Sequence, residues 1–264
     1  QEQQAALSQK FSESALDATD AFRYYASAAE MAGVPADVQQ TALAVAQADG
    51  KDGYRLTLKM PCYLPVMQFA HSSPLRATLY RAYVTRASAQ AAEGSRGWDN
   101  TQTMQHILAL RQEESALLGY PNFGTLSLVP KMASSPDAVI TFLRDLAHKA
   151  RPYAENDLAD LRLFAQEHLL MADPQPWDWA YVGEKLKEAR YAFSEQDVKQ
   201  YFTFPKVLAG KTVIGDLVVS KATGKSIAIV AVPVVRPDKT VAGVLGSSVY
   251  LDQLSTRLER EMDL

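Results

Sequence analysis

Cysteine and histidine are scarce in this sequence of 264 residues. Cys62 is the single cysteine, so no internal disulfide can form and a disulfide-stapled extracellular fold is excluded. We expect a buried structural role for Cys62, because a catalytic thiol needs an adjacent base and no histidine lies nearer in sequence than His71. His106, His148 and His168 are the other histidines; no two of the four lie four residues apart, and no glutamate directly follows any of them. The spacing therefore predicts no metal site.

The sequence also lacks an excess of basic charge and a long apolar run. Its formal net charge of -3 makes nucleic acid a poor partner. The longest apolar run, at 227–235, is far shorter than the roughly 20 residues that cross a bilayer, so no membrane segment is predicted. The polar start, QEQQ, has no signal-peptide order, and its first residue is not Met, which predicts an excerpt or a processed chain. We expect a cytoplasmic location for the first 210 residues.

Helical periodicity dominates residues 12–201, and one segment shows the reasons. Ser135, Pro136 and Asp137 suit a helix N-terminus as cap, first-turn proline and acid favoured by the helix dipole. Pro152 is expected to end or kink this helix, because it lacks the backbone donor and clashes with the preceding turn. Apolar residues follow at spacings of three and four, first as one stripe and then, after Pro152, as a second. They are Val139, Ile140, Leu143, Leu146, Ala147 and Ala150, then Leu158, Leu161, Phe164, Ala165 and Leu169.

Strand patterns interrupt the helices once and then replace them. Tyr54, Leu56 and Leu58 alternate with polar neighbours within 50–65, which predicts a short strand. Ser194 and Asp197 mark one more helix start. After Gly210 we predict strands at 226–235 and 240–250, a turn at 237–239 and a closing helix at 251–262. The fold class is therefore α+β: a mostly helical body at 1–210 and a small antiparallel β unit with a C-terminal helix at 211–264.

Motifs spread over residues 11–210 resemble the thimet oligopeptidase and oligopeptidase A family of zinc metallopeptidases. The resemblance is dense and keeps the family's order and spacing. It is carried by GYRLTL (53–58), PCYLPVM (61–67), YRAYVTRAS (80–88), WDN (98–100), LLGY (117–120) and PWDWAY (176–181).

This resemblance implies a helical, two-lobed body around a channel in which short peptides are cleaved with zinc. The family's H-E-x-x-H segment, a further glutamate and the downstream Tyr and His that stabilise the intermediate lie beyond the point where the resemblance stops. We therefore predict no catalytic residue, no metal ligand and no cofactor here, although zinc is expected for the parent family. Tyr80, Arg81, Tyr83 and Arg86 are the candidate peptide-contacting residues, because Arg can pair with a peptide carboxylate and Tyr can stack and donate. Local ion pairs are the competing role for the two arginines.

Residues 211–264 resemble the closing half of a Cache sensor domain, the ligand-binding module of bacterial chemoreceptors and sensor kinases. The resemblance implies two antiparallel strands of a PAS-like sheet followed by a helix. Ser248 stands where amino-acid-sensing members carry an aspartate, and the first pocket strands have no counterpart. It rests on VIGD (213–216), SKATGK (220–225), AVPV (231–234), GVLG (243–246) and LDQLS (251–255).

Three interpretations of the whole chain compete. We favour a chimera or fragment without a catalytic site of its own, joined at Gly210–Lys211, where helical periodicity gives way to strands. The alternatives are a peptide-binding module with part of the channel wall, and part of a zinc oligopeptidase that works only with a missing catalytic lobe. A Cache-type small-molecule sensor is a further alternative for the second piece. Apolar helix faces that lose their partner lobe predict homo-oligomerisation, or contact between 227–250 and the helical body.

Overall fold

A computed structural model describes residues 2–191, 213–214, 218–219, 226–235 and 241–250. The chain divides into two compact units, Gln1–Gly183 and Glu184–Leu264, which we describe separately. The predicted junction at Gly210–Lys211, the helix start at Ser194, the turn at 237–239 and the closing helix at 251–262 lie outside the described residues.

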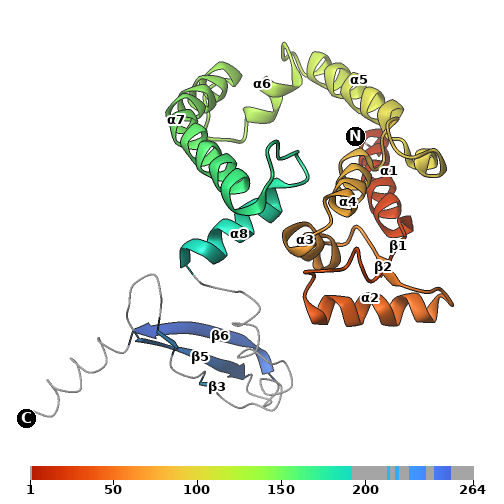
Figure 1. Ribbon diagram of the computed structural model, residues 1–264. Coiled ribbons are helices and arrows are strands. Elements are labelled where there is room, and N and C mark those ends of the chain that lie inside the picture. The colour runs from red at the N-terminus through yellow and green to blue at the C-terminus, as the bar shows by residue number, and fades with distance from the viewer. Residues whose placement is uncertain (1, 192–212, 215–217, 220–225, 236–240, 251–264) are drawn as a thin grey trace, which may run out of the picture. The chain divides into compact units, whose positions relative to one another are not determined.

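The first unit is almost entirely helical, with one two-stranded ladder, and the second contains the remaining strands (Figure 1). In chain order the elements are α1 (Glu2–Ala21), β1 (Tyr24–Ala26), α2 (Ala36–Ala48), β2 (Tyr54–Leu56), α3 (Met60–Phe69), α4 (Ser73–Thr85), the 3₁₀ helix η1 (Glu93–Trp98), α5 (Thr101–Leu117), α6 (Phe123–Leu128), α7 (Pro136–Leu169), α8 (Trp179–Tyr191), β3 (Val213–Ile214), β4 (Val218–Val219), β5 (Ser226–Val235) and β6 (Val241–Tyr250).

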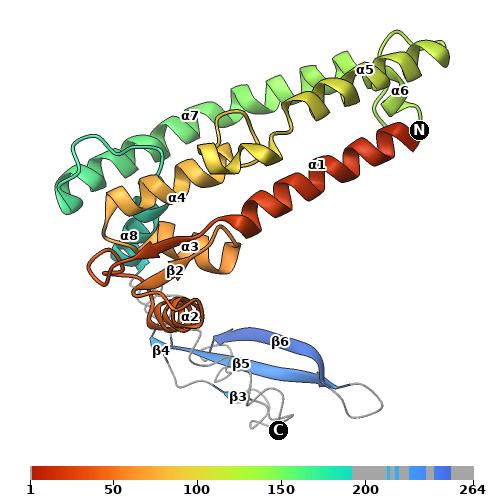
Figure 2. The ribbon, with the colours of Figure 1, turned by 90° about the vertical axis from the view of Figure 1, so that its right-hand side faces the viewer.

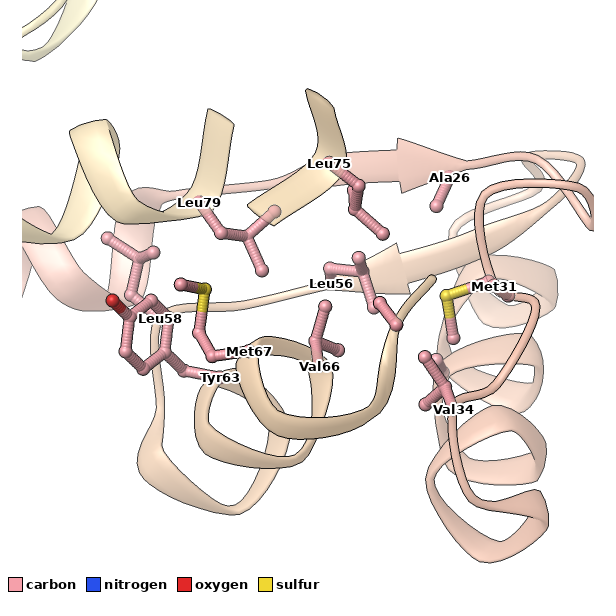
Figure 3. Close-up of a cluster of buried hydrophobic side chains, with 12 residues drawn as sticks. Ala26, Met31, Val34, Leu56, Leu58, Tyr63, Val66, Met67, Leu75 and Leu79 are labelled. Carbon is pink, nitrogen blue, oxygen red and sulfur yellow. The ribbon is translucent and has the colours of Figure 1, made fainter. Parts of the chain in front are cut away.

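The core of the first unit is built around the antiparallel pair β1–β2. Tyr24 pairs with Leu56, and Ala26 with Tyr54. The side chains of Leu56 and Leu58 point into a cluster closed by α2, α3 and α4 (Figure 3). Two strands alone are marginal in water, so these helices supply the apolar cover that the ladder needs. The buried cluster consists of Ala26, Met31, Val34, Ala42, Leu56, Leu58, Tyr63, Val66, Met67, Ala70, Leu75 and Leu79.

The strand predicted within 50–65 is present but short, and a helix follows it at once. α3 begins at Met60, with Pro61 in its first turn, where a proline loses no helical hydrogen bond. Cys62 is half-buried rather than buried; it packs against the core, and its Sγ accepts a hydrogen bond from the backbone N–H of Thr57 at 3.4 Å. The partner strand β1 was not predicted from the sequence, because three residues are too few for a visible alternation.

Helix α7 is one continuous helix through Pro152, so Pro152 does not end it, and a kink there stays a prediction. Its start is as predicted: the Ser135 hydroxyl accepts a hydrogen bond from the Ala138 N–H at 3.1 Å. Pro152 is exposed, so water can take the place of the missing backbone donor. The helix ends at Leu169, and the residue that caps it, Leu170, has a left-handed φ of 54°. None of the described helices combines the length and apolar character that a membrane span requires.

The second unit contains an antiparallel sheet organised on β5. β6 pairs with β5 along its length, from Ile227 opposite Tyr250 to Val235 opposite Val241. β3 and β4 each pair with a short segment of β5, at Val230–Ala231 and Ser226–Ile227 respectively. Both long strands agree with the sequence prediction, whereas the two-residue strands β3 and β4 were missed because they are too short to show a pattern.

Gly33 fixes the turn before α2. Its φ is +87°, and a Cβ there would lie 2.5 Å from the His71 ring and closer still to the Phe69 carbonyl oxygen. Gly119 has a similar φ of +78° but nothing within 4 Å of a Cβ. An alanine at Gly119 would therefore meet backbone strain alone, whereas an alanine at Gly33 would meet both backbone strain and steric overlap.

We predict that Gly33→Ala lowers the free energy of unfolding by about 3 kcal/mol, since strain and overpacking add. Gly119→Ala should cost about 1 kcal/mol, from strain alone. Urea denaturation followed by circular dichroism measures both. Equal losses would contradict the close approach at Gly33.

Candidate functional site

The candidate site lies on α4, and the local sequence explains why a helix begins there. The hydroxyl of Ser72 accepts a hydrogen bond from the Leu75 N–H at 3.3 Å, and a proline occupies the first turn. Leu75, Arg76 and Leu79 are buried at helical spacing and turn one face of α4 into the core. The remaining faces carry the aromatic and basic side chains of interest.

A buried ion pair fastens α4 to the segment that precedes α8. Arg76 is 1% exposed, and its Nη2 lies 2.6 Å from Oδ1 of Asp178, which is also buried. The other end nitrogen of Arg76 donates to the Ala70 carbonyl, and the guanidinium lies 4.3 Å from the centre of the Tyr181 ring. Asp178 also accepts from the Ser73 hydroxyl at 2.8 Å and the Gln175 N–H at 3.0 Å. A charge pair this deeply buried is tolerated only with such additional hydrogen bonds.

Trp177 lies beside this ion pair and organises the outer surface of α4. Its ring N–H donates to the Ser73 hydroxyl at 3.1 Å, which fixes the plane of the indole. Tyr80 tilts against the indole, with ring centres 6.3 Å apart. The guanidinium carbon of Arg81 lies 5.5 Å from the centre of the indole ring, and Arg81 is exposed. Tyr80, Arg81 and Trp177 form what we call the Trp177 cluster.

A second stack forms one turn further along α4. The rings of Tyr63 and Tyr83 stack with their centres 4.3 Å apart. The guanidinium carbon of Arg86 lies over the Tyr83 ring, 3.8 Å from its centre. Arg86 also donates to the Tyr83 carbonyl oxygen at 2.5 Å. Burial, together with Tyr83 and Tyr80, raises the pKa of Tyr63 to about 12, so its hydroxyl stays neutral at physiological pH.

The four residues predicted to contact peptides therefore lie on one helix and its cap, but in two different environments. Tyr83 stacks on Tyr63, and Arg86 lies over the Tyr83 ring, so both side chains are engaged in contacts within the protein. Tyr80 and Arg81 belong to the Trp177 cluster, and there Arg81 keeps its guanidinium at the surface. Within the part of the chain that the structure describes, neither arginine forms an ion pair; both lie over aromatic rings instead. Local ion pairs, the competing role for these two arginines, stay a prediction.

The described residues do not fit a zinc ion. None of the His, Cys, Asp and Glu side chains in the described ranges come together in a group of three that could bind a metal. All four histidines are exposed and scattered: His71 faces the Tyr181 ring, His106 lines a shallow hollow between α1 and α5, His148 lies on α7, and His168 stacks on Phe164. We therefore derive no catalytic step through a metal in these residues.

The motifs that suggested this family agree with the comparison to known proteins. The profile of peptidase family M3 matches residues 66–217, more than half of the sequence, and the chain belongs to this family. The match also runs past the predicted junction at Gly210.

Among its relatives are oligopeptidases A from bacteria and a plant. The proteins from Salmonella typhimurium and Escherichia coli are each 43% identical over 205 residues, covering 77% of this chain and 30% of the relative. The organellar oligopeptidase A of Arabidopsis thaliana is 36% identical over 214 residues, covering 77% of this chain and 26% of the relative. The chain thus spans less than a third of the length of the relatives it matches.

Removal of the Asp178 carboxylate should destabilise the first unit strongly. Asp178→Ala leaves the Arg76 charge buried and unpaired, and we expect a loss of about 3–5 kcal/mol in the free energy of unfolding. Asp145→Ala, which breaks the exposed pair with Lys149, should cost less than about 1 kcal/mol. Chemical denaturation of both variants measures the difference. A loss below about 1 kcal/mol for Asp178→Ala would show that the pair does not hold α4 to this segment.

Proposed function

We propose that the chain is a peptide-binding piece of an M3 oligopeptidase scaffold, a chimera or fragment without a catalytic site of its own, located in the cytoplasm. The observation that carries this proposal is the Trp177 cluster. Its exposed Arg81 guanidinium is held over a fixed indole and beside a tyrosine ring, in a protein of a peptidase family. Arg81 supplies charge for a peptide carboxylate, while the two rings supply flat apolar surface for a peptide side chain.

The rings also prepare Arg81 for binding. Stacking over Trp177 limits the rotamers of a side chain that would otherwise lose about 2 kcal/mol of conformational freedom on binding. Because an aromatic face leaves the guanidinium N–H groups unused, they remain available for a carboxylate fork. Short peptides with a free C-terminal carboxylate and an apolar last residue are therefore the ligands of choice.

Calorimetric titration of the whole chain with a short peptide that ends in a free carboxylate tests the binding part. Arg81→Ala should weaken binding by about 1 kcal/mol, roughly fivefold in Kd, and so should amidation of the peptide. Arg96→Ala, an exposed arginine on η1, is the matched control and should leave Kd unchanged. No heat with any peptide, or equal effects of the two arginines, would reject the proposal.

The absence of catalysis is tested on the same protein. A quenched fluorescent peptide is incubated with the purified chain, with and without a chelator, and zinc is measured in the sample. We expect no cleavage above buffer. Chelator-sensitive cleavage would instead support the alternative, a zinc-dependent oligopeptidase portion.

A second candidate function concerns residues 211–264 as a Cache-type unit that binds a small molecule. The antiparallel pairing of β6 with β5, and of β5 with β3 and β4, supports a PAS-like sheet there. A thermal-shift screen of the whole chain with free amino acids and small carboxylates tests it: stabilisation by one of them supports this function, and no shift with any of them counts against it.

A further inference from the structure

In the part of the chain that the structure describes, the middle of α7 is exposed over several turns. Every residue from Ile140 to Asp157 is exposed, although the stripe predicted from the sequence places large apolar side chains there. Figure 2 shows α7 as one long helix. A helix of this kind gains little stability by itself in water and depends on packing of its apolar face. The exposed side chains include Ile140, Phe142, Leu143, Leu146 and Tyr153.

Small residues occupy the centre of this apolar face. Ala147, Ala150 and Ala154 follow each other at three and four residues, so they form one line along the helix at about 100° per residue. Leu143, Leu146 and Tyr153 border that line. A second helix can approach closely over alanines while it packs against the larger neighbours, which is the pattern of a helix–helix contact.

Charges beside this line specify which helix fits. Asp137, Arg144, Glu155 and Arg162 lie on the same flank of α7, because they are separated by seven, eleven and seven residues. The pairs Asp137–Arg162 and Arg144–Glu155 share one midpoint, between Lys149 and Ala150. A second α7, run antiparallel through that midpoint, places each acid opposite a base. In a parallel two-fold pair the same flanks lie on opposite sides of the contact, so these charges would not meet.

We propose that a second copy of this chain covers α7, through antiparallel contact of the two α7 helices across the alanine line. The contact is two-fold symmetric, so Arg144 of each copy faces Glu155 of the other, and both charge pairs form twice. Apolar burial supplies the attraction, and the charges set direction and register.

Sedimentation equilibrium of the whole chain and of charge-reversed variants tests this contact. The unaltered chain should dimerise, while Arg144→Glu and Glu155→Arg should each weaken dimerisation roughly tenfold or more. The double variant Arg144→Glu/Glu155→Arg restores opposite charges only in the antiparallel pair, so its Kd should return to within about threefold of the unaltered chain.

The control reverses charges on the opposite side of the same helix. Asp145→Arg breaks an exposed ion pair with Lys149, just as Glu155→Arg breaks one with Arg151. The two variants should therefore lose a similar amount of helix stability. Its Kd should not change, and circular dichroism checks that every variant is equally helical. A chain that stays monomeric at all concentrations would overturn the proposal. So would a double variant as weak as its parents, or equal loss in Asp145→Arg.

Discussion

The ion pair between Arg76 and Asp178 is the contact on which the first unit depends. It joins positions more than a hundred residues apart, and both charges are out of water. An unpaired charge at this depth is far more costly than a paired one. The first unit therefore folds stably only when both residues are in place. Trp177 and Tyr181 flank Asp178 in sequence, so the pair also brings their rings to α4. The surface that we propose for peptide binding is thus a by-product of a stability element.

Arginine–aromatic contact recurs along α4 and gives the site its character. Arg76, Arg81 and Arg86 each lie over a ring, of Tyr181, Trp177 and Tyr83 respectively. The three arginines differ in how deeply they are buried, and this difference separates their roles. Arg76 is fully enclosed and structural, Arg86 is partly enclosed and closes a stack, and Arg81 stays in contact with solvent. The same interaction therefore occurs in the buried scaffold and at the surface that we propose for peptide binding.

Local features were predictable from the sequence, and long-range ones were not. The Ser135 cap of α7 and the strand β5 follow from a few adjacent residues, and both are present. Tyr80, Arg81, Tyr83 and Arg86 are close in sequence and lie on α4 and its cap, but in two different environments. Their partners could not be foreseen: Trp177 and Tyr63 meet α4 only through the tertiary fold. Pro152 was expected to end or kink α7, but the helix runs through it in a stretch that is exposed to water.

Cys62 gives the core a reporter that needs no engineering. The thiol is half-buried at the first turn of α3, where it accepts a hydrogen bond from Thr57 next to β2. Because the thiol is half-buried, separation of α3 from the ladder would expose it further and raise its rate of labelling by a thiol reagent. As the sequence holds no second cysteine, the whole signal comes from one place. Because Cys62 is the single cysteine of this sequence, its labelling can report on local opening of the core without any substitution.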